Sequence, residues 1–509
     1  MPKDEMPREN IVSEKKLKVL FCTSTYSGGG GSERVLTVLL NNLPKNWDVD
    51  ILEVRAFNIK KEALTSQARL LPYLVRDRDR TKFNALLVHV FLHHPRLIKT
   101  FRRLYNYDVV IGWMASEGVS ILPAFPECKK IAWFHNNIDY LKDYLKESCI
   151  TSDSNIDQYI GHYRNKRLFN ILKDVCDSAD ALIGVSKMCK ASIASVYPNH
   201  KNKTFTIYNG TDINEVQAMS REKIGNTELS VLYEKLIREA PLLICVGHIC
   251  KRKNFSLAVQ SLSILRKKGF LCNLVIIGSP SNKADLENLK DAIQACEVQE
   301  HVFLFGYQKN PLPFVARAKL LLMTSLDEGF PTVVTEGIAL GIPFITTPVE
   351  GASDELLNEG KCGLLSSWEA IDYASCIERV LKDEELYKTM SKNCKEHVKT
   401  YSTENYVGSL QTLLDDIDKK AKPVYKRQNI VLASLLFIFY SAFYAAYKNP
   451  RTVYSAKASF DCLKTHFSFL EVAKCCYKIG LYVVNILCFV PLLIYSSVLF
   501  IKCRKRIFG

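Results

Sequence analysis

Short apolar runs alternate with longer amphipathic stretches in the first part of the chain. The segment at 33–43 carries apolar residues at helical spacing. Runs typical of buried strands occur at 18–23, 49–54, 109–112, 131–134 and 181–185. Strands that alternate with helices predict βαβ units and a parallel sheet.

The same alternation begins again near residue 241. Apolar runs recur at 242–246, 274–278, 302–305, 320–323 and 343–346, with helical stretches between them. The pattern therefore predicts two α/β domains, at 17–212 and 241–400, joined by a polar hinge at 213–240. Two such domains that face one another form a cleft at the carboxyl ends of their strands, where open α/β sheets bind ligands.

The pattern changes again after the second domain. A closing helix and a basic linker are expected at 401–427, before a hydrophobic region at 428–509. Within that region, 428–447 and 479–501 contain no charged residue. Each is long enough to cross roughly 30 Å of hydrocarbon as a helix. We therefore expect the region to associate with a membrane.

The basic residues around these two segments bear on how the segments are oriented in a membrane. Lysines and arginines flank the pair at both outer ends, as the positive-inside rule requires of a hairpin whose ends are cytoplasmic. The loop between the segments is also basic, which disfavours its translocation. A re-entrant or interface-lying arrangement therefore stays open, and so does a pair of buried core helices.

A further basic region lies at 55–103. Near its end, apolar residues share one helical face with cations between them; they are Leu97, Ile98, Phe101 and Leu104. Such a helix suits an anionic headgroup surface. A solvated helix with ordinary core contacts is the alternative.

Composition narrows the class of protein. The 509 residues exceed one ordinary core, and 48% of them are hydrophobic while 24% are charged, as in folded proteins. The net charge of +15 calls for nucleic acid, an anionic membrane or a phosphate-bearing substrate as a partner. No basic and aromatic recognition motif is present, so nucleic acid is the least favoured of the three.

The cysteines and the N-terminus point to the cytosol. None of the 17 cysteines forms a C-x-x-C pair, so neither zinc ligation nor redox chemistry is expected. Small buried thiols in a reducing compartment are the simpler interpretation. Residues 1–16 form a polar tail without the apolar stretch of a secretory signal. The catalytic domains are therefore expected on the cytoplasmic face of the membrane.

A glycine-rich loop follows the first predicted strand. Gly28, Gly29, Gly30 and Gly31 stand immediately before the first predicted helix. Their backbone can approach a ligand closely, and the free N–H groups of the helix start favour an anion such as a diphosphate. The loop lacks the G-K-[ST] of a P-loop, which disfavours an ATPase.

The most informative motif is DEGFPTVVTEGIALGIP at 327–343. A predicted strand precedes it, and Pro331 stands where a helix is expected to begin. Glu328 then lies in the turn and Glu336 about one helical turn in. The residues expected around a bound diphosphate and its sugar are Glu328, Gly329, Phe330, Pro331, Thr332, Val333 and Glu336.

These motifs resemble family 4 retaining glycosyltransferases of the GT-B fold, whose hallmark is two glutamates separated by seven residues. The resemblance covers about residues 17–400. It implies two Rossmann-like domains, the first for the acceptor and the second for the nucleotide-sugar. It also implies that Glu328 holds the transferred sugar, that Glu336 holds the ribose and that His135 is the active-site histidine. Other matching segments are 28–34, 180–186, 207–212 and 246–255.

One position departs from the family pattern. His248 stands where the family usually has arginine in the donor-phosphate motif, although Lys253 is in place. Histidine supplies less fixed positive charge, because its unperturbed pKa lies near 6.5. Lys251 and Arg252 are candidates to replace the missing cation.

No metal ion is expected. Asp77 and Asp79 spell a D-x-D motif, but the arginines around them indicate a charge-balanced surface segment. The charge of the leaving diphosphate can instead be met by Lys253, the helix start at Thr332 and the glycine loop. The nucleotide-sugar is a substrate, so no cofactor is expected.

The sequence thus predicts an enzyme that moves a sugar from a nucleotide diphosphate, with UDP favoured, to a lipid-linked or polysaccharide acceptor. Glu328, Lys253 and His135 are the expected catalytic residues, and the acceptor hydroxyl is expected near His135 and Gly29. Retention at the anomeric carbon is implied by the resemblance. The alternative is an inactive, membrane-anchored protein that binds nucleotide-sugar or glycan, with His248 as a mark of lost activity.

Overall fold

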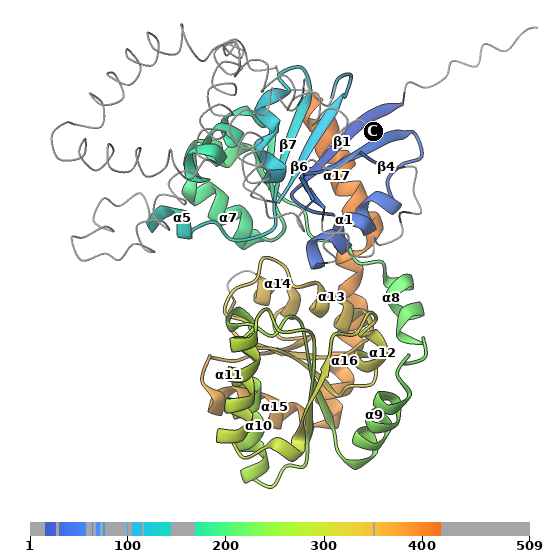
Figure 1. Ribbon diagram of the computed structural model, residues 1–509, viewed down its shortest axis with the longest axis vertical. Helices are drawn as coiled ribbons and strands as arrows, with labels where there is room; N and C mark the ends of the chain where they lie inside the picture. Colours follow the sequence, from blue (N-terminus) through green and yellow to red (C-terminus); the bar gives the residue numbers. More distant parts are fainter. Residues whose placement is uncertain are drawn as a thin grey trace, which may run out of the picture. The chain divides into compact units, whose positions relative to one another are not determined.

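The computed structural model describes two α/β domains and the segments that connect them (Figure 1). The described residues are 16–26, 30–56, 64, 68–71, 75–76, 99, 104–114, 117–143, 168–349 and 352–418. Both domains belong to one compact unit, made of Met1–Arg78 and Asn106–Lys422. The predicted membrane segments at 428–447 and 479–501 lie outside the described residues, as do most of the basic region at 55–103 and the D-x-D motif.

The first domain is built on a parallel sheet. Its seven described strands lie in the order β4-β2-β1-β6-β7-β8-β9. They are β1 (Leu17–Thr23), β2 (Trp47–Glu53), β4 (Arg69–Leu70), β6 (Val109–Trp113), β7 (Lys129–Phe134), β8 (Ala181–Gly184) and β9 (Thr204–Thr206). Two short strands, β3 (Arg55–Ala56) and β5 (Val75–Arg76), pair separately. In the centre, Val19 lies in register with Val49 and Val109.

The central strands of this sheet are buried on both faces. Consecutive residues of β1 and β6 are inaccessible to solvent, which is why these strands read as continuous apolar runs rather than alternating ones. Among the described residues of this domain, the helices and 3-10 turns include α1 (Gly31–Asn41), α4 (Glu117–Ser120), η1 (Leu122–Ala124), α5 (Tyr140–Asp143), α7 (Lys187–Val196) and η3 (Pro198–Lys203), and residues 168–178 are helical as well.

The second domain repeats the design. Its described strands are also parallel, in the order β12-β11-β10-β13-β14-β15. They are β10 (Leu242–Val246), β11 (Asn273–Ile277), β12 (Val302–Gly306), β13 (Leu320–Met323), β14 (Phe344–Thr346) and β15 (Gly363–Leu365). Alternate residues of β10 enter two different core clusters: Leu243 belongs to one and Ile244 to the other. Helices therefore cover both faces of this sheet.

The helices of the second domain lie between its strands and after them. They are α10 (Phe255–Lys267), α11 (Lys283–Ala295), α12 (Leu312–Val315), α13 (Thr332–Ala339), α14 (Ala352–Leu357), α15 (Ala370–Lys382) and α16 (Glu384–His397). Three 3-10 turns accompany them: η4 (Lys251–Lys253), η5 (Gln299–His301) and η6 (Val398–Tyr401).

The chain passes between the domains twice, and the two passages touch. The backbone N–H of Thr211 donates to the carbonyl of Tyr401 at 2.8 Å. Gly210 lies so close to Tyr406 that a Cβ at this glycine would come within 2.3 Å of the ring. The returning helix α17 (Thr403–Asp418) then packs beside α1 of the first domain (Figure 1).

The fold confirms the expected α/β architecture of two domains with parallel sheets. The segment predicted as a polar hinge, 213–240, contains two helices, α8 (Ile213–Ser220) and α9 (Thr227–Glu239); that it bends stays a prediction. Every described cysteine is a free thiol, and most are buried. Within the described part of the chain, no helix combines the length and apolar character that a membrane crossing requires.

Candidate active site

A cavity of about 420 Å³ is lined by residues of both domains. This volume lies in the usual range for small-molecule sites. Its walls come from the start of α1, from the residues that follow β7, β10, β11 and β12, and from the turn between β13 and α13. The cavity therefore lies at the carboxyl ends of the parallel strands, as the sequence predicts.

Two glycines keep one wall of the cavity open. Gly247 and Gly278 follow neighbouring strands and adopt φ angles of 147° and 150°, which side chains rarely tolerate. A Cβ at Gly278 would lie 1.9 Å from the carbonyl oxygen of Gly247. The backbone at the ends of β10 and β11 is thus accessible to a ligand because neither position carries a side chain.

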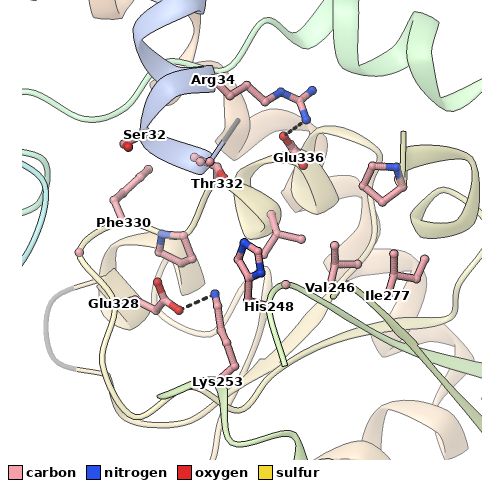
Figure 2. A pocket seen from close by; sticks show the side chains of 18 of the residues that line it. Ser32, Arg34, Val246, His248, Lys253, Ile277, Glu328, Phe330, Thr332 and Glu336 are labelled. Carbon is pink, nitrogen blue, oxygen red and sulfur yellow. Dashed lines mark hydrogen bonds and ion pairs between the residues drawn. The ribbon is translucent and has the colours of Figure 1, made fainter. Parts of the chain in front are cut away.

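Glu328 is buried and held by three donors. Its Oε1 accepts from Lys253 Nζ at 2.6 Å, from a guanidinium nitrogen of Arg252 at 2.8 Å and from Ser325 Oγ at 2.9 Å. All three reach the same oxygen, so they fix the carboxylate while no contact among the described residues engages Oε2. Figure 2 shows Glu328 facing Lys253.

The two cations also keep Glu328 ionised. Burial alone would raise the pKa of this carboxyl, but the charges and hydrogen bonds of Lys253 and Arg252 outweigh burial, and the pKa is lowered. Glu328 therefore presents a negative charge to the cavity at neutral pH. Such a carboxylate can accept hydrogen bonds from hydroxyl groups of a sugar.

The start of α13 forms the adjacent wall. Pro331 precedes the helix, and no side chain caps its first N–H groups. The dipole of α13 and the N–H groups of Thr332 and Val333 therefore favour an anion at this point. Thr332 and Val333 both line the cavity.

Glu336 lies one turn further along α13 and is paired across the cavity. Its Oε1 is 2.8 Å from a guanidinium nitrogen of Arg34, which lies on α1 of the first domain (Figure 2). The sequence placed Arg34 in the glycine-loop motif but gave it no role. Its partnership with Glu336 spans about 300 positions, and no local sequence pattern could indicate it.

The glycine loop reaches the start of α13. A Cβ at Gly31 would lie 3.4 Å from Thr332 Oγ1, so the backbone of this loop runs directly beside the helix start. Gly30 also lines the cavity. Gly28 and Gly29, which belong to the same prediction, lie outside the described residues.

His135 follows β7, and its backbone carbonyl lies against Gly329 in the turn that carries Glu328. It is 7% exposed, and its ring centre lies 4.2 Å from that of Trp113. Its Nε2 has no hydrogen-bond partner among the described residues. Burial lowers the pKa of His135 to about 3, so the imidazole is neutral at physiological pH. It can therefore donate or accept a hydrogen bond toward a ligand, but it supplies no positive charge.

The buried imidazole predicts a measurable loss of stability in acid. The unfolded chain protonates this histidine near pH 6.5, whereas the folded protein does so only near pH 3. The free energy of unfolding should therefore fall as the pH drops from 6.5 toward 3, by up to about 1.4 kcal/mol per pH unit. Denaturant titrations of the wild type and of His135→Phe should show the steeper fall in the wild type. Parallel curves would rule out a neutral buried imidazole.

His248, Lys251 and Arg252 differ in whether they reach the cavity. His248 is exposed at the cavity wall, with Nδ1 3.4 Å from Ser279 Oγ. Arg252 lines the cavity, whereas Lys251 is not among the lining residues. Of the two candidates to replace the missing cation, the structure thus brings Arg252 to the site.

Most of the predicted site residues meet at this cavity. Those lining it are Gly30, Gly31, His135, His248, Lys253, Glu328, Gly329, Phe330, Pro331, Thr332, Val333 and Glu336. The sequence did not single out Asn209, Tyr307, Gln308 and Lys309, which also line it. The loop after β12 that carries the last three has no glycine-rich or acidic signature. The roles assigned to the site residues stay predictions.

Comparison with known families assigns a domain to each half. Residues 29–215 match the family Glycosyltransferase Family 4, and residues 234–397 match Glycosyl transferases group 1. Together the two matches account for both α/β domains of the structure.

Two curated relatives share part of the chain. An uncharacterized glycosyltransferase of Methanocaldococcus jannaschii is 26% identical over 278 residues, which are 55% of this chain and 63% of that protein. The capsular polysaccharide biosynthesis glycosyltransferase CapM of Staphylococcus aureus is 28% identical over 223 residues, 43% of this chain and 57% of CapM. The chain thus spans less than two thirds of the length of either relative.

A solved structure supports the fold. The Anabaena protein HepE, in complex with UDP-glucose, aligns with a TM-score of 0.58 and 15% identity over 79% of this chain and 100% of HepE. At this identity the likeness bears on the fold alone. The chain therefore carries a Glycosyltransferase Family 4 domain followed by a Glycosyl transferases group 1 domain, arranged as a GT-B-like pair of α/β domains with parallel sheets.

Proposed function

We propose that this protein is a glycosyltransferase that moves a sugar from a nucleotide diphosphate, with UDP as the favoured nucleotide, to a membrane-associated acceptor. The observation that carries the proposal is the placement of Glu328 and Glu336 on either side of the uncapped start of α13, with both side chains lining one cavity. HepE, whose complex contains UDP-glucose, supports the choice of UDP.

The diphosphate of the donor would lie at the start of α13. There the N–H groups of Thr332 and Val333, the helix dipole and the ammonium of Lys253 stabilise the negative charge that grows as the bond to the anomeric carbon breaks. This supply of positive charge needs no metal ion. Lys253 already lies 2.6 Å from Glu328, so sugar and diphosphate would meet at one ion pair.

The two glutamates would hold opposite ends of the donor. Glu336 accepts from the ribose hydroxyls, which must share or replace its contact with Arg34. Glu328 accepts from hydroxyls of the transferred sugar through Oε2, because the three donors on Oε1 fix its orientation. A donor held at both ends has its anomeric carbon fixed before an acceptor arrives.

The acceptor would enter from the first domain, near His135 and the glycine loop. Gly29 is part of this proposal and lies outside the described residues. Retention at the anomeric carbon follows from the family resemblance. Closure of the two domains over the donor would exclude water, which otherwise competes with the acceptor hydroxyl.

The C-terminal segments of the chain are the basis for proposing a membrane-associated acceptor. The two uncharged segments at 428–447 and 479–501 and the basic residues around them favour association with an anionic membrane surface. The catalytic domains would then work at the cytoplasmic face. The relative CapM is named for capsular polysaccharide biosynthesis, and a lipid-linked or surface-polysaccharide precursor fits both observations.

A donor screen tests this function against the alternative of an inactive binding protein. The full chain is incubated with UDP-, GDP- and ADP-sugars, with and without membrane extract as acceptor, and release of the nucleoside diphosphate is measured. We expect release from a UDP-sugar that rises when extract is added and that persists in the presence of a chelator. Binding of a nucleotide-sugar without any release would support the inactive protein instead.

A further inference from the structure

Arg252 lies in the short turn η4 and is tied to the loop that carries Glu328. Its carbonyl accepts from the backbone N–H of Leu326 at 2.8 Å. Its guanidinium donates to the carbonyl of Asp327 and to Glu328 Oε1, each at 2.8 Å. These bonds hold the side chain at the cavity wall although it is about half exposed.

Two cations meet one carboxylate in the lining at this wall. Arg252 and Lys253 bring two positive charges to the single carboxylate of Glu328. The neighbouring Asp327 also attracts Arg252, but it is exposed and is not among the residues that line the cavity. Counted over the lining residues at this point, positive charge therefore exceeds negative charge.

Other cationic side chains line the cavity at other places. Arg34 is paired with Glu336 at 2.8 Å, and Lys309 lies in the loop after β12. His248 follows β10, with its Nδ1 3.4 Å from Ser279 Oγ. A guanidinium keeps its charge at every physiological pH and has several donors in one plane, which suits phosphate oxygens.

We propose that Arg252 acts together with Lys253 as a permanent cation for the diphosphate of the donor, and that it also positions Glu328. This inference rests on the proposed function, because it assigns a ligand group to the same cavity. It predicts that the chain needs no charge on His248 for donor binding. Arg252 touches both the carboxylate that would hold the sugar and the space for the diphosphate, so one residue would connect the two halves of the donor.

Calorimetric titration with UDP and with uridine tests the assignment without any sugar transfer. Loss of a hydrogen bond between charged partners should weaken UDP binding by roughly 10- to 100-fold in Arg252→Ala. Uridine has no phosphate, so its affinity should stay unchanged. Arg252→Lys keeps the charge and should recover part of the UDP affinity. Arg252→Gln, which keeps most of the size, serves as a second uncharged variant if the alanine variant unfolds.

Lys251→Ala is the matched control. It removes one positive charge from the same turn, but Lys251 does not line the cavity, so UDP affinity should stay within about twofold of the wild type. Adding His248→Arg to Arg252→Ala should restore much of the lost affinity, since it places a permanent cation elsewhere on the same wall.

Two results would overturn the inference. One is UDP affinity in Arg252→Ala and Arg252→Gln equal to that of the wild type. The other is a loss of uridine affinity as large as the loss of UDP affinity, which would indicate a purely structural role. A wild-type chain that binds UDP but transfers no sugar would contradict the proposed transfer and leave the role of Arg252 standing.

Discussion

Replacing Glu328 with glutamine is expected to lower kcat by about 10²- to 10³-fold, the usual cost of removing one preorganised electrostatic contact to a transition state. The amide keeps the size of the side chain but loses the charge that Lys253 and Arg252 hold in place. Only the oxygen of the amide can accept from the three donors at Oε1, so the NH2 group must take the place of Oε2, where it cannot accept from a sugar hydroxyl. The measurement is steady-state release of UDP from the donor found in the screen.

The affinity for UDP should change far less than kcat, because UDP carries no transferred sugar. Glu385→Gln is the control, since this carboxylate on α16 is exposed and does not line the cavity. It should keep the activity of the wild type. Equal kcat values for Glu328→Gln and the wild type would remove Glu328 from the reaction.

Gly329→Ala is expected to lower the rate of sugar transfer almost as much as Glu328→Gln does. A Cβ at this position would lie 1.8 Å from the carbonyl oxygen of His135, where backbone has to move. Because Gly329 and His135 lie in different domains, the added methyl group would push the Glu328 turn away from the first domain. A misplacement of about 1 Å can cost 10²-fold in rate, and we expect a fall in kcat/KM of at least that size.

Gly225→Ala is the matched control for this substitution. No atom lies within 4 Å of the place that its Cβ would take, and its backbone does not need a glycine. The control should match the wild type in activity and thermal stability. Gly329→Ala should lose about 1–3 kcal/mol of stability, as overpacked positions do. Full activity in Gly329→Ala would mean that the two domains do not meet at this turn during the reaction.

The alternation of apolar runs was sufficient to predict the two sheets. Strands such as β10 and β13 begin and end at the residues expected, because both faces are buried and each strand is a continuous apolar run. The shorter strands β4, β9 and β15 were not predicted. They lie at the edges of their sheets, and two or three residues are too few to establish a period.

The site could be predicted where its residues are close in sequence. The turn and helix from Glu328 to Glu336 follow local rules: a proline at the start, small residues in the turn and an apolar face behind. The pairing of Arg34 with Glu336 and the convergence of Lys253 and Arg252 on Glu328 join positions far apart in the chain. Such contacts depend on how the domains pack, which no local pattern contains.

The helices α8 and α9 were not predicted from the sequence, for a different reason. Both lie in the stretch 213–240, which the sequence predicts as a polar hinge. Each nevertheless begins with a side-chain cap: Asp212 accepts from the N–H of Glu215, and Asn226 from that of Leu229. Asp and Asn are preferred at the residue before a helix, so these two positions favour helix starts within the stretch.

A crystal structure of the protein with an intact UDP-sugar would show directly where the donor binds. We expect the diphosphate at the start of α13 beside Lys253, the ribose at Glu336 and the sugar at Glu328. A nucleotide bound outside this cavity, or one that leaves both glutamates without contact to the donor, would rule out this donor site.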